Sequence, residues 1–337
     1  MKDLLKVKKR EKNDIVKIPT GSLNLNLAGS GCYDWCFESK REVEIFGALG
    51  SGKSTVSQEI AEEARKAYLE NGIKTRINIF DGEFKADENY LQKIIKKEDY
   101  NLIRENIVEE IWAQIVELLE AGEKIFIIDS VASLTDYEQK KRGIGKLGFS
   151  SIAKTMKWGL RNYTPDIYRA NAFLIFVNHI AYKIGVTFGD NITTPGGDAV
   201  KFYSSYRIQV WTNRGSAKTS KTKDLVGGNQ NITDLKDIET GITMKCKIVK
   251  NDTFSPYRTC EIPIEYGKGI NRLEDLIIFL IKIGFMEKSG KKYLLKGEED
   301  KIIERKLTDG LTDNKSKIYK DAWKYIKTYG FEKVEEN

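Results

Sequence analysis

Short apolar runs alternate with stretches of helical periodicity along roughly the first 270 residues of the chain. The apolar runs predict strands at 42–46, 74–80, 124–130, 172–178, 206–211, 243–249 and 259–266. Apolar residues three or four positions apart predict helices at 51–70, 106–120 and 151–160. Strands and helices alternate, and "KIFIIDS" has the continuous apolar core of a strand covered on both faces. We therefore expect an α/β fold with a mostly parallel central sheet.

The alternation of strands and helices ends near residue 271. The segment "LEDLIIFLIKIGF" predicts an apolar helix, and a second helix is expected at 316–329, after a stretch rich in Lys and Glu. Within the preceding part, the polar segment 215–234 predicts a mobile surface excursion. We expect a basic N-terminal arm with a short helix at 1–16, a core at 17–270 and a small C-terminal α+β domain at 271–337.

The chain is mildly basic, with 56 Lys and Arg against 49 Asp and Glu and a net charge of +7. This balance permits a polyanionic partner but does not require one, because the charges are interspersed. The N-terminal stretch "MKDLLKVKKREKND" is too charged for a signal peptide. No uninterrupted apolar run approaches the length of a membrane span. We therefore expect a cytoplasmic protein without a membrane partner.

A glycine-rich loop, "GALGSGKST", follows the first expected strand and precedes a helix. In such a loop successive N–H groups face a phosphate, and the following helix adds its positive N-terminal end. The expected nucleotide-binding residues are Gly47, Ala48, Leu49, Gly50, Ser51, Gly52, Lys53, Ser54 and Thr55. Lys53 is expected to reach the terminal phosphates and the Ser54 hydroxyl to bind Mg²⁺. Asp129, at the end of a buried strand, is the expected second anchor for the metal ion.

Nucleotide hydrolysis also needs a group that orients or deprotonates water. The segment "NIFDGE" places Asp81 and Glu83 just beyond an expected strand. We expect Asp81 to hold the loop and Glu83 to act as the base. His179, the one histidine of the chain, ends the apolar strand "AFLIFVN". Taken alone, a histidine at a strand end is most often structural.

From about Ile18 to Asn271 the chain resembles the bacterial RecA recombinase family. The resemblance rests on "PTGSLNLNLA", "GALGSGKST", "DGE", "DSVASLT", "IVKN", "YGKGIN" and above all "IAYKIGVTFGDNITTPGGDAVKFYSSYRI". It implies a RecA-type P-loop NTPase core that uses ATP and Mg²⁺. It also implies a DNA-dependent ATPase that forms helical homo-oligomeric filaments on single-stranded DNA, pairs them with homologous double-stranded DNA and exchanges strands. Single-stranded-DNA-binding and loading proteins are further implied partners.

The resemblance also implies roles for individual residues. Glu83 matches the family's catalytic glutamate, and Asp87 and Tyr90 match residues that contact adenine. Tyr266, in "YGKGIN", matches a residue near the nucleotide at the subunit boundary. Lys250, in "IVKN", matches a lysine that reaches the γ-phosphate held by the neighbouring subunit, as an arginine finger does in trans.

Two loops are expected to line the filament axis, at 141–148 and at 180–198. Glycines let the backbone approach phosphates, and backbone N–H contacts carry no base information, which suits binding to any sequence. The expected DNA-binding residues are Arg142, Gly143, Gly145, Lys146, Lys157, Lys183, Ile184, Gly185, Val186, Thr194, Gly196 and Gly197.

The chain departs from the family pattern at several places. Asp252 stands where the family has a second lysine after Lys250, and the N-terminal arm is shorter than the family's subunit-linking segment. His179 replaces a glutamine that senses the γ-phosphate and sets the second DNA loop. A neutral imidazole still donates one hydrogen bond, so we expect His179 to take this catalytic role. The histidine also suggests a phage-encoded recombinase.

Two alternatives stay open. One is a filament scaffold that binds ATP and DNA but hydrolyses little. The other is a ring-forming motor with the same fold.

Overall fold

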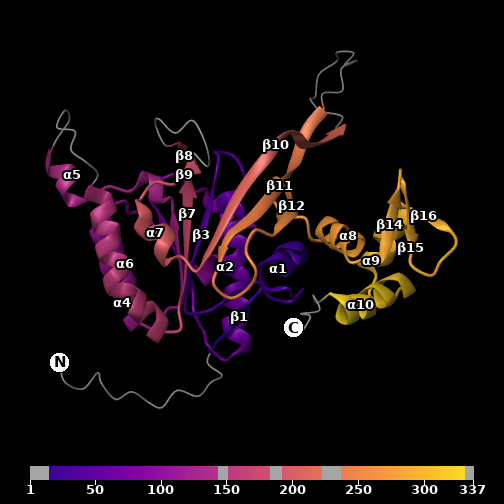
Figure 1. The fold of residues 1–337 in the computed structure, drawn as a ribbon, viewed down its shortest axis with the longest axis horizontal. Coiled ribbons are helices and arrows are strands. Elements are labelled where there is room, and N and C mark those ends of the chain that lie inside the picture. Colours follow the sequence, from indigo (N-terminus) through magenta and orange to yellow (C-terminus); the bar gives the residue numbers. More distant parts are fainter. Residues whose placement is uncertain (1–14, 143–150, 183–191, 222–236, 331–337) are drawn as a thin grey trace.

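The computed structural model describes residues 15–142, 151–182, 192–221 and 237–330. Its centre is a sheet (Figure 1) whose strands run in the order β13 (Gly269–Ile270), β12 (Thr259–Glu265), β11 (Asp237–Asn251), β10 (Tyr206–Lys221), β3 (Arg41–Gly47), β7 (Phe173–His179), β6 (Ile125–Asp129), β4 (Ile77–Asp81) and β5 (Tyr100–Ile103). Neighbouring strands from β10 to β5 are parallel, whereas β11, β12 and β13 continue the sheet with antiparallel pairing. The predicted α/β class with a mostly parallel sheet is confirmed.

Helices cover both faces of this sheet. α1 (Leu23–Ser30) and α2 (Lys53–Glu70) pack on one face, and α4 (Val108–Glu120), α6 (Ser151–Arg169) and α7 (Asp198–Tyr203) pack on the other. Successive residues of a buried strand point to opposite faces. In β6, Ile127 therefore joins the hydrophobic cluster under α2, and Ile128 joins the one under α4 and α6. This explains why "KIFIIDS" is apolar without alternation.

The remaining short elements frame the sheet. β1 (Lys17–Ile18) pairs with β2 (Phe37–Glu38), and β8 (Ala181–Tyr182) pairs with β9 (Ile192–Thr193). Two short helices, α3 (Glu88–Leu91) and α5 (Tyr137–Arg142), and two 3₁₀ turns, at Lys97–Asp99 and Val131–Ser133, complete the core. No helix within the described ranges is long and apolar enough to span a membrane.

One sequence expectation for the core needs correction in part. Segment 215–234 was expected to be a mobile surface excursion, but its first part, up to Lys221, continues β10; residues 222–234 lie outside the described residues. Backbone pairing with β11 holds this part, from Ala217 opposite Ile242 to Lys221 opposite Asp237. The hairpin extends well beyond the neighbouring strand β3 (Figure 1). Ladder hydrogen bonds depend on the backbone, so polar side chains do not prevent a strand here. Residues 1–14 of the expected arm at 1–16 lie outside the described residues.

The C-terminal part has a small hydrophobic core of its own. It consists of α8 (Arg272–Lys282), β14 (Met286–Ser289), β15 (Lys292–Leu295), β16 (Lys301–Ile303), α9 (Glu304–Thr312) and α10 (Lys317–Tyr329). Phe279, Tyr293, Leu307 and Ile326 are buried together in this core, and Leu27 of α1 joins them from the neighbouring part of the chain. The predicted apolar helix thus exists but ends at Lys282.

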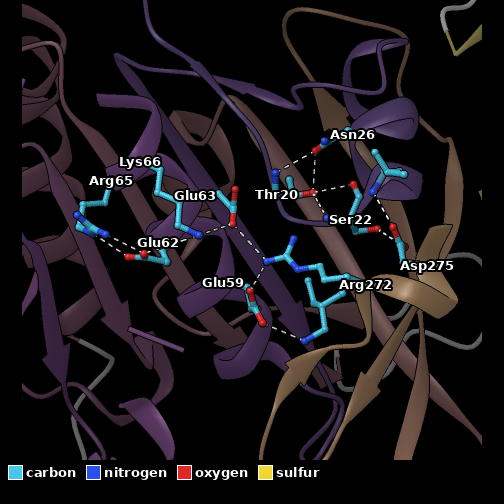
Figure 2. A network of polar contacts seen from close by, with 12 residues as sticks. Thr20, Ser22, Asn26, Glu59, Glu62, Glu63, Arg65, Lys66, Arg272 and Asp275 are labelled. Atoms are coloured by element: carbon cyan, nitrogen blue, oxygen red, sulfur yellow. Dashed lines mark hydrogen bonds and ion pairs between the residues drawn. The ribbon is translucent and has the colours of Figure 1, made fainter. Parts of the chain in front are cut away.

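Ion pairs join α8 to α2, the helix that follows the glycine-rich loop (Figure 2). Arg272 donates to Glu59 at 2.6 Å and to Glu63 at 3.3 Å. Glu59 also accepts the N–H of Ile270 at 2.9 Å, and its side chain is only 8% exposed. Beside these contacts, the buried Asp275 accepts the Ser22 hydroxyl at 2.6 Å. The C-terminal part is therefore anchored to the helix that begins at the predicted phosphate site.

We expect Arg272→Met to lower the free energy of unfolding by about 1–2 kcal/mol, because it removes a charge-assisted hydrogen bond to a buried carboxylate. Urea titration measures the change. Arg169→Met is the matched control, because Arg169 pairs with Asp166 at 2.9 Å on the exposed surface, where ion pairs contribute little. Equal losses in the two variants would contradict a special role for the α2–α8 contact.

A second buried carboxyl group makes stability depend on pH. Glu42, in β3, is 3% exposed, and its Oε1 has no hydrogen-bond partner among the described residues. Burial raises the pKa of Glu42 from 4.5 to about 7. The folded protein therefore keeps a proton that the unfolded chain loses between these pH values. Stability from this group is complete below pH 4.5 and is lost as the pH rises through about 7.

Between pH 5 and pH 8 the free energy of unfolding should fall by about 2 kcal/mol more in the wild type than in Glu42→Gln, because glutamine does not ionise. Denaturant titrations at the two pH values measure this difference. Glu117→Gln, on the exposed face of α4, should follow the wild type at both pH values. A Glu42→Gln variant whose stability falls with pH as steeply as the wild type would contradict the assignment.

Candidate active site

The glycine-rich loop between β3 and α2 requires glycine because of its backbone angles and its close packing. Gly50 and Gly52 have φ angles of 72° and 88°, in the left-handed region that favours glycine. A Cβ on Gly52 would lie 2.7 Å from Ile264 Cδ1, and one on Gly47 would lie 2.1 Å from the carbonyl oxygen of Val210. The loop therefore packs tightly on β10 and β12 while its tip stays open. Leu49, at that tip, is 84% exposed.

Lys53 begins α2 and folds back over the loop. Its Nζ donates to the carbonyl oxygen of Ala48 at 2.8 Å, and the Ser51 hydroxyl donates to the same oxygen at 2.8 Å. Burial lowers the pKa of Lys53, and the carboxylates of Asp129 and Glu83 act in the opposite direction. The loop thus holds a partly desolvated cation above the start of a helix, where an anion is favoured.

Ser54 and Asp129 form the predicted pair of metal anchors. Asp129 is partly exposed, but desolvation still raises the pKa of its carboxyl group, and a hydrogen bond from Ser54 partly offsets this rise. Hydroxyl and carboxylate oxygens are donors that Mg²⁺ accepts, and two protein ligands leave positions for phosphate oxygens and water. Within the described part of the chain, no three His, Cys, Asp or Glu side chains form a metal-binding group. The pair therefore fits a Mg²⁺ ion that arrives with a nucleotide.

Side chains from three separate parts of the chain surround Glu83. Its Oε1 accepts the Ser130 hydroxyl at 2.8 Å and lies 3.0 Å from His179 Nε2, while Lys85 Nζ lies 3.5 Å from its Oε2. Burial alone would raise the pKa of Glu83, but the hydrogen bonds from His179 and Ser130 outweigh it and lower the pKa. Glu83 is therefore ionised at neutral pH.

A chain of hydrogen bonds leads from this carboxylate toward the second predicted DNA loop. Next to His179, the buried Asn178 donates to Glu44 at 2.9 Å and to the carbonyl oxygen of Pro195 at 3.0 Å. The Asn178 side chain also accepts the N–H of His179 at 2.9 Å. The sequence analysis missed Asn178, whose only signal was a polar residue at the end of an apolar strand. Its contacts bring the region after β9 close to Glu83.

The predicted adenine contacts come from α3 and the residue that caps it. Asp87 caps α3 by accepting the N–H of Asn89 at 2.8 Å, and the Tyr90 hydroxyl lies 2.8 Å from Thr55 Oγ1. Tyr266, predicted near the nucleotide, is half exposed. These side chains line the same cavity as the glycine-rich loop.

That cavity has a volume of about 530 Å³ and gathers most of the predicted nucleotide site. The predicted residues that line it are Leu49, Gly50, Ser51, Gly52, Lys53, Ser54, Thr55, Glu83, Asp87, Tyr90, Asp129, His179 and Tyr266. Gly47 and Ala48 lie just behind it in the loop. Sequence reasoning missed other lining residues, including Gln58, Lys85, Ile242 and Ile264, which belong to no motif.

Lys250 is the one predicted catalytic residue that does not line this cavity. Its Nζ donates to the carbonyl oxygen of Phe202 at 2.8 Å and lies 3.9 Å from Asp252 Oδ1. Within a single chain Lys250 therefore contacts α7 and not the phosphate site.

The predicted DNA-binding residues are only partly described. Gly143, Gly145, Lys146, Lys183, Ile184, Gly185 and Val186 lie outside the described residues, and for Arg142 only its place at the end of α5 is described. Gly196 and Gly197, both at positive φ, lead into α7. Thr194 is buried, so its side chain does not face solvent in this conformation.

Lys157 lies on an exposed face of α6 that sequence reasoning only partly identified. Lys154, Trp158 and Arg161 are also exposed. Spacings of three and four residues among these four positions put them on one face of α6. Lys154 and Lys157 line a second cavity of about 540 Å³ together with Phe202, which is 75% exposed. The three- and four-residue spacing of these cations was the signal that could have revealed the whole face.

We expect His179→Ala to raise the pKa of Glu83, because it removes a hydrogen bond to the ionised carboxylate. Carboxyl ¹³C NMR of glutamate-labelled protein measures this pKa, with Glu83→Gln identifying the resonance. His179→Gln, whose amide also donates, should keep the pKa close to that of the wild type. An unchanged pKa in His179→Ala would contradict the hydrogen bond's role.

Comparison with known proteins identifies the family of this chain. A family described as "RecA N-terminal domain" matches residues 2–271. Protein RecA of Paracoccus denitrificans is 34% identical over 283 residues, which cover 83% of this chain and 72% of that protein. Protein RecA of Methylococcus capsulatus is 35% identical over 287 residues, covering 85% and 75%. Protein RecA of Geobacter sulfurreducens is 33% identical over 288 residues, covering 85% and 77%.

These three relatives come from bacteria, and a phage origin stays a prediction. The match extends over the glycine-rich loop, the cavity residues and the strand that ends at His179. The chain therefore belongs to the bacterial RecA recombinase family.

Proposed function

We propose that this protein is a DNA-dependent ATPase that forms helical filaments on single-stranded DNA and exchanges strands with homologous duplex. One observation carries the proposal. A single cavity unites the glycine-rich loop, a Mg²⁺-compatible pair and an ionised carboxylate, and hydrogen bonds connect that carboxylate to the second predicted DNA loop. Nucleotide hydrolysis and the conformation of the second predicted DNA loop would therefore depend on the same contacts.

The chemistry would follow from the positions of the side chains. Lys53 and the loop N–H groups would bind the phosphates, and Ser54 and Asp129 would hold Mg²⁺, which neutralises phosphate charge when bound. Glu83 would accept the proton of the attacking water, because it is ionised at neutral pH and its charge acts on Lys53, which lines the same cavity. Asp87 and Tyr90 would contact the base.

Filament formation is supported by the position of Lys250. In the single chain this lysine is bound to the carbonyl oxygen of Phe202, outside its own cavity. It could act on a nucleotide only in a neighbouring copy, which is the role that family resemblance implies. Asp252 at 3.9 Å reduces the positive charge that it would bring. For this reason a filament that hydrolyses ATP slowly is the second candidate.

DNA binding is supported by the exposed face of α6. Lys154, Lys157 and Arg161 offer cations to phosphates, and Trp158 and Phe202 offer aromatic surfaces on which bases can stack. Cations interleaved with aromatics bind single strands without reading their sequence. Homologous duplex, single-stranded-DNA-binding proteins and loading proteins are further proposed partners.

The proposal predicts ATP hydrolysis that single-stranded DNA accelerates. Steady-state ATP turnover with and without DNA measures this acceleration, and electron microscopy with DNA, Mg²⁺ and a slowly hydrolysed ATP analogue tests for filaments. Filaments without accelerated turnover would favour the scaffold. Closed rings alone would contradict the proposal.

Coupling through His179 gives a second prediction. His179→Ala should bind ATP nearly as well as the wild type but lose the ATP-dependent tightening on single-stranded DNA, because the connection from Glu83 toward Pro195 is interrupted. Fluorescence anisotropy of labelled DNA, with and without the ATP analogue, measures the tightening. His179→Gln should retain it. Normal tightening in His179→Ala would refute the coupling.

A further inference from the structure

Lys85 is a lysine of the cavity wall that belongs to none of the motifs. It lies between β4 and α3 and lines the candidate active site. Its side chain is 78% exposed, and its Nζ lies 3.5 Å from Glu83 Oε2. The other oxygen of Glu83 is already occupied by Ser130 and His179. Lys85 is therefore a mobile cation beside the proposed base.

The backbone around Lys85 is held in place. Phe84, immediately before it, has a φ of 58°, a left-handed conformation that side chains other than glycine rarely adopt. The N–H of Ala86, immediately after it, donates to the buried Asp81 at 2.9 Å. Asp87 is fixed as the cap of α3. The segment turns sharply at Phe84 and places Lys85 at the cavity mouth, which agrees with strain concentrating at functional sites.

Charge balance gives this lysine a specific use. Four carboxyl side chains line the cavity, namely Asp81, Glu83, Asp87 and Asp129. Among the described lining residues, Lys53 and Lys85 are the two lysines, and Lys53 belongs to the glycine-rich loop. A nucleoside triphosphate brings more negative charge than a diphosphate. Lys53, the proposed ligand of the terminal phosphates, lies close enough to Glu83 to be affected by its charge, so the added charge of a triphosphate would lie near Glu83. Without Lys85, the terminal phosphate would lie beside the carboxylate of Glu83, and Lys53 would be the one lysine of the described cavity lining left to balance the charge.

We propose that Lys85 binds the terminal phosphate of a nucleoside triphosphate from within the same chain. On binding, Lys85 exchanges Glu83 for phosphate oxygens, and this leaves Glu83 Oε2 free to face water. Lys85 thereby supplies positive charge from within the same chain. This charge would compensate for the charge of Lys250 in a neighbouring copy, which Asp252 reduces. This inference rests on the proposed function, because it requires that the cavity bind a nucleotide.

The test compares triphosphate and diphosphate affinities without DNA. Calorimetry measures the Kd of a non-hydrolysed ATP analogue and of ADP, each with Mg²⁺, for the wild type, Lys85→Met and Lys85→Arg. Lys317→Met is the matched control, because Lys317 is 77% exposed and pairs with Glu298 at 3.0 Å on the C-terminal part. We expect Lys85→Met to weaken the ATP analogue about tenfold, the size of one charge-assisted hydrogen bond, and to leave ADP within about twofold.

Lys85→Arg should retain most of the affinity for the ATP analogue, and Lys317→Met should match the wild type. Equal weakening of both nucleotides, or no weakening, in Lys85→Met would overturn the inference while leaving nucleotide binding intact. If the wild type bound neither nucleotide, the proposed function itself would fail, and this inference with it. Thermal melting of each variant confirms that the exposed substitution leaves the fold unchanged.

Discussion

The site depends on the register of parallel strands in the central sheet. Gly47 at the end of β3 is paired with His179 at the end of β7, and Asp81 of β4 is paired with Asp129 of β6. Parallel strands bring their carboxyl ends to one edge, where ligands of such sheets bind. A shift of one residue in any of these pairs would turn a polar side chain to the other face. The chemistry is therefore a consequence of how apolar strands pair.

Hydrogen bonds within that edge then set the charge of the site. Hydrogen bonds from Ser130 and His179 lower the pKa of Glu83 against the effect of burial, and Asn178 connects the same edge to the carbonyl oxygen of Pro195. Burial acts against charge at Asp129 and Lys53, so a Mg²⁺-bound polyphosphate would stabilise both ionised forms. In the protein alone the cavity is acidic and partly desolvated, and a bound nucleotide with Mg²⁺ would supply the missing partners of its charged groups.

The parts predicted from sequence were those with local signals. The glycine-rich loop and the strand ends were found because their residues are contiguous and their periodicity is clear. α1 was missed because "LNLNLAGS" alternates with the period of a strand. Its asparagines are buried, and Asn24 donates to Asp275, which lies 251 residues away in the sequence. Contacts over such sequence separations leave no periodic signal.

The same reason explains the gaps in the predicted site. Asn178 acts through Glu44 and Pro195, which only folding brings near, and Lys85 belongs to no motif. The cationic face of α6 was only partly identified because the predicted helix stopped at residue 160, whereas α6 continues to Arg169. Lys250 was placed by family resemblance alone, since its proposed partner belongs to another chain. The polar extension of β10 escaped prediction because backbone hydrogen bonds, and not side-chain burial, hold it.

The central claim is that Glu83 is the base of an ATPase built on this edge. Single-turnover hydrolysis of ATP by Glu83→Gln, in the presence of single-stranded DNA, tests it most directly. The account predicts that this variant binds ATP and DNA but hydrolyses ATP about a hundredfold more slowly or worse, the usual size of a lost general base. Hydrolysis at the wild-type rate by Glu83→Gln would contradict the account.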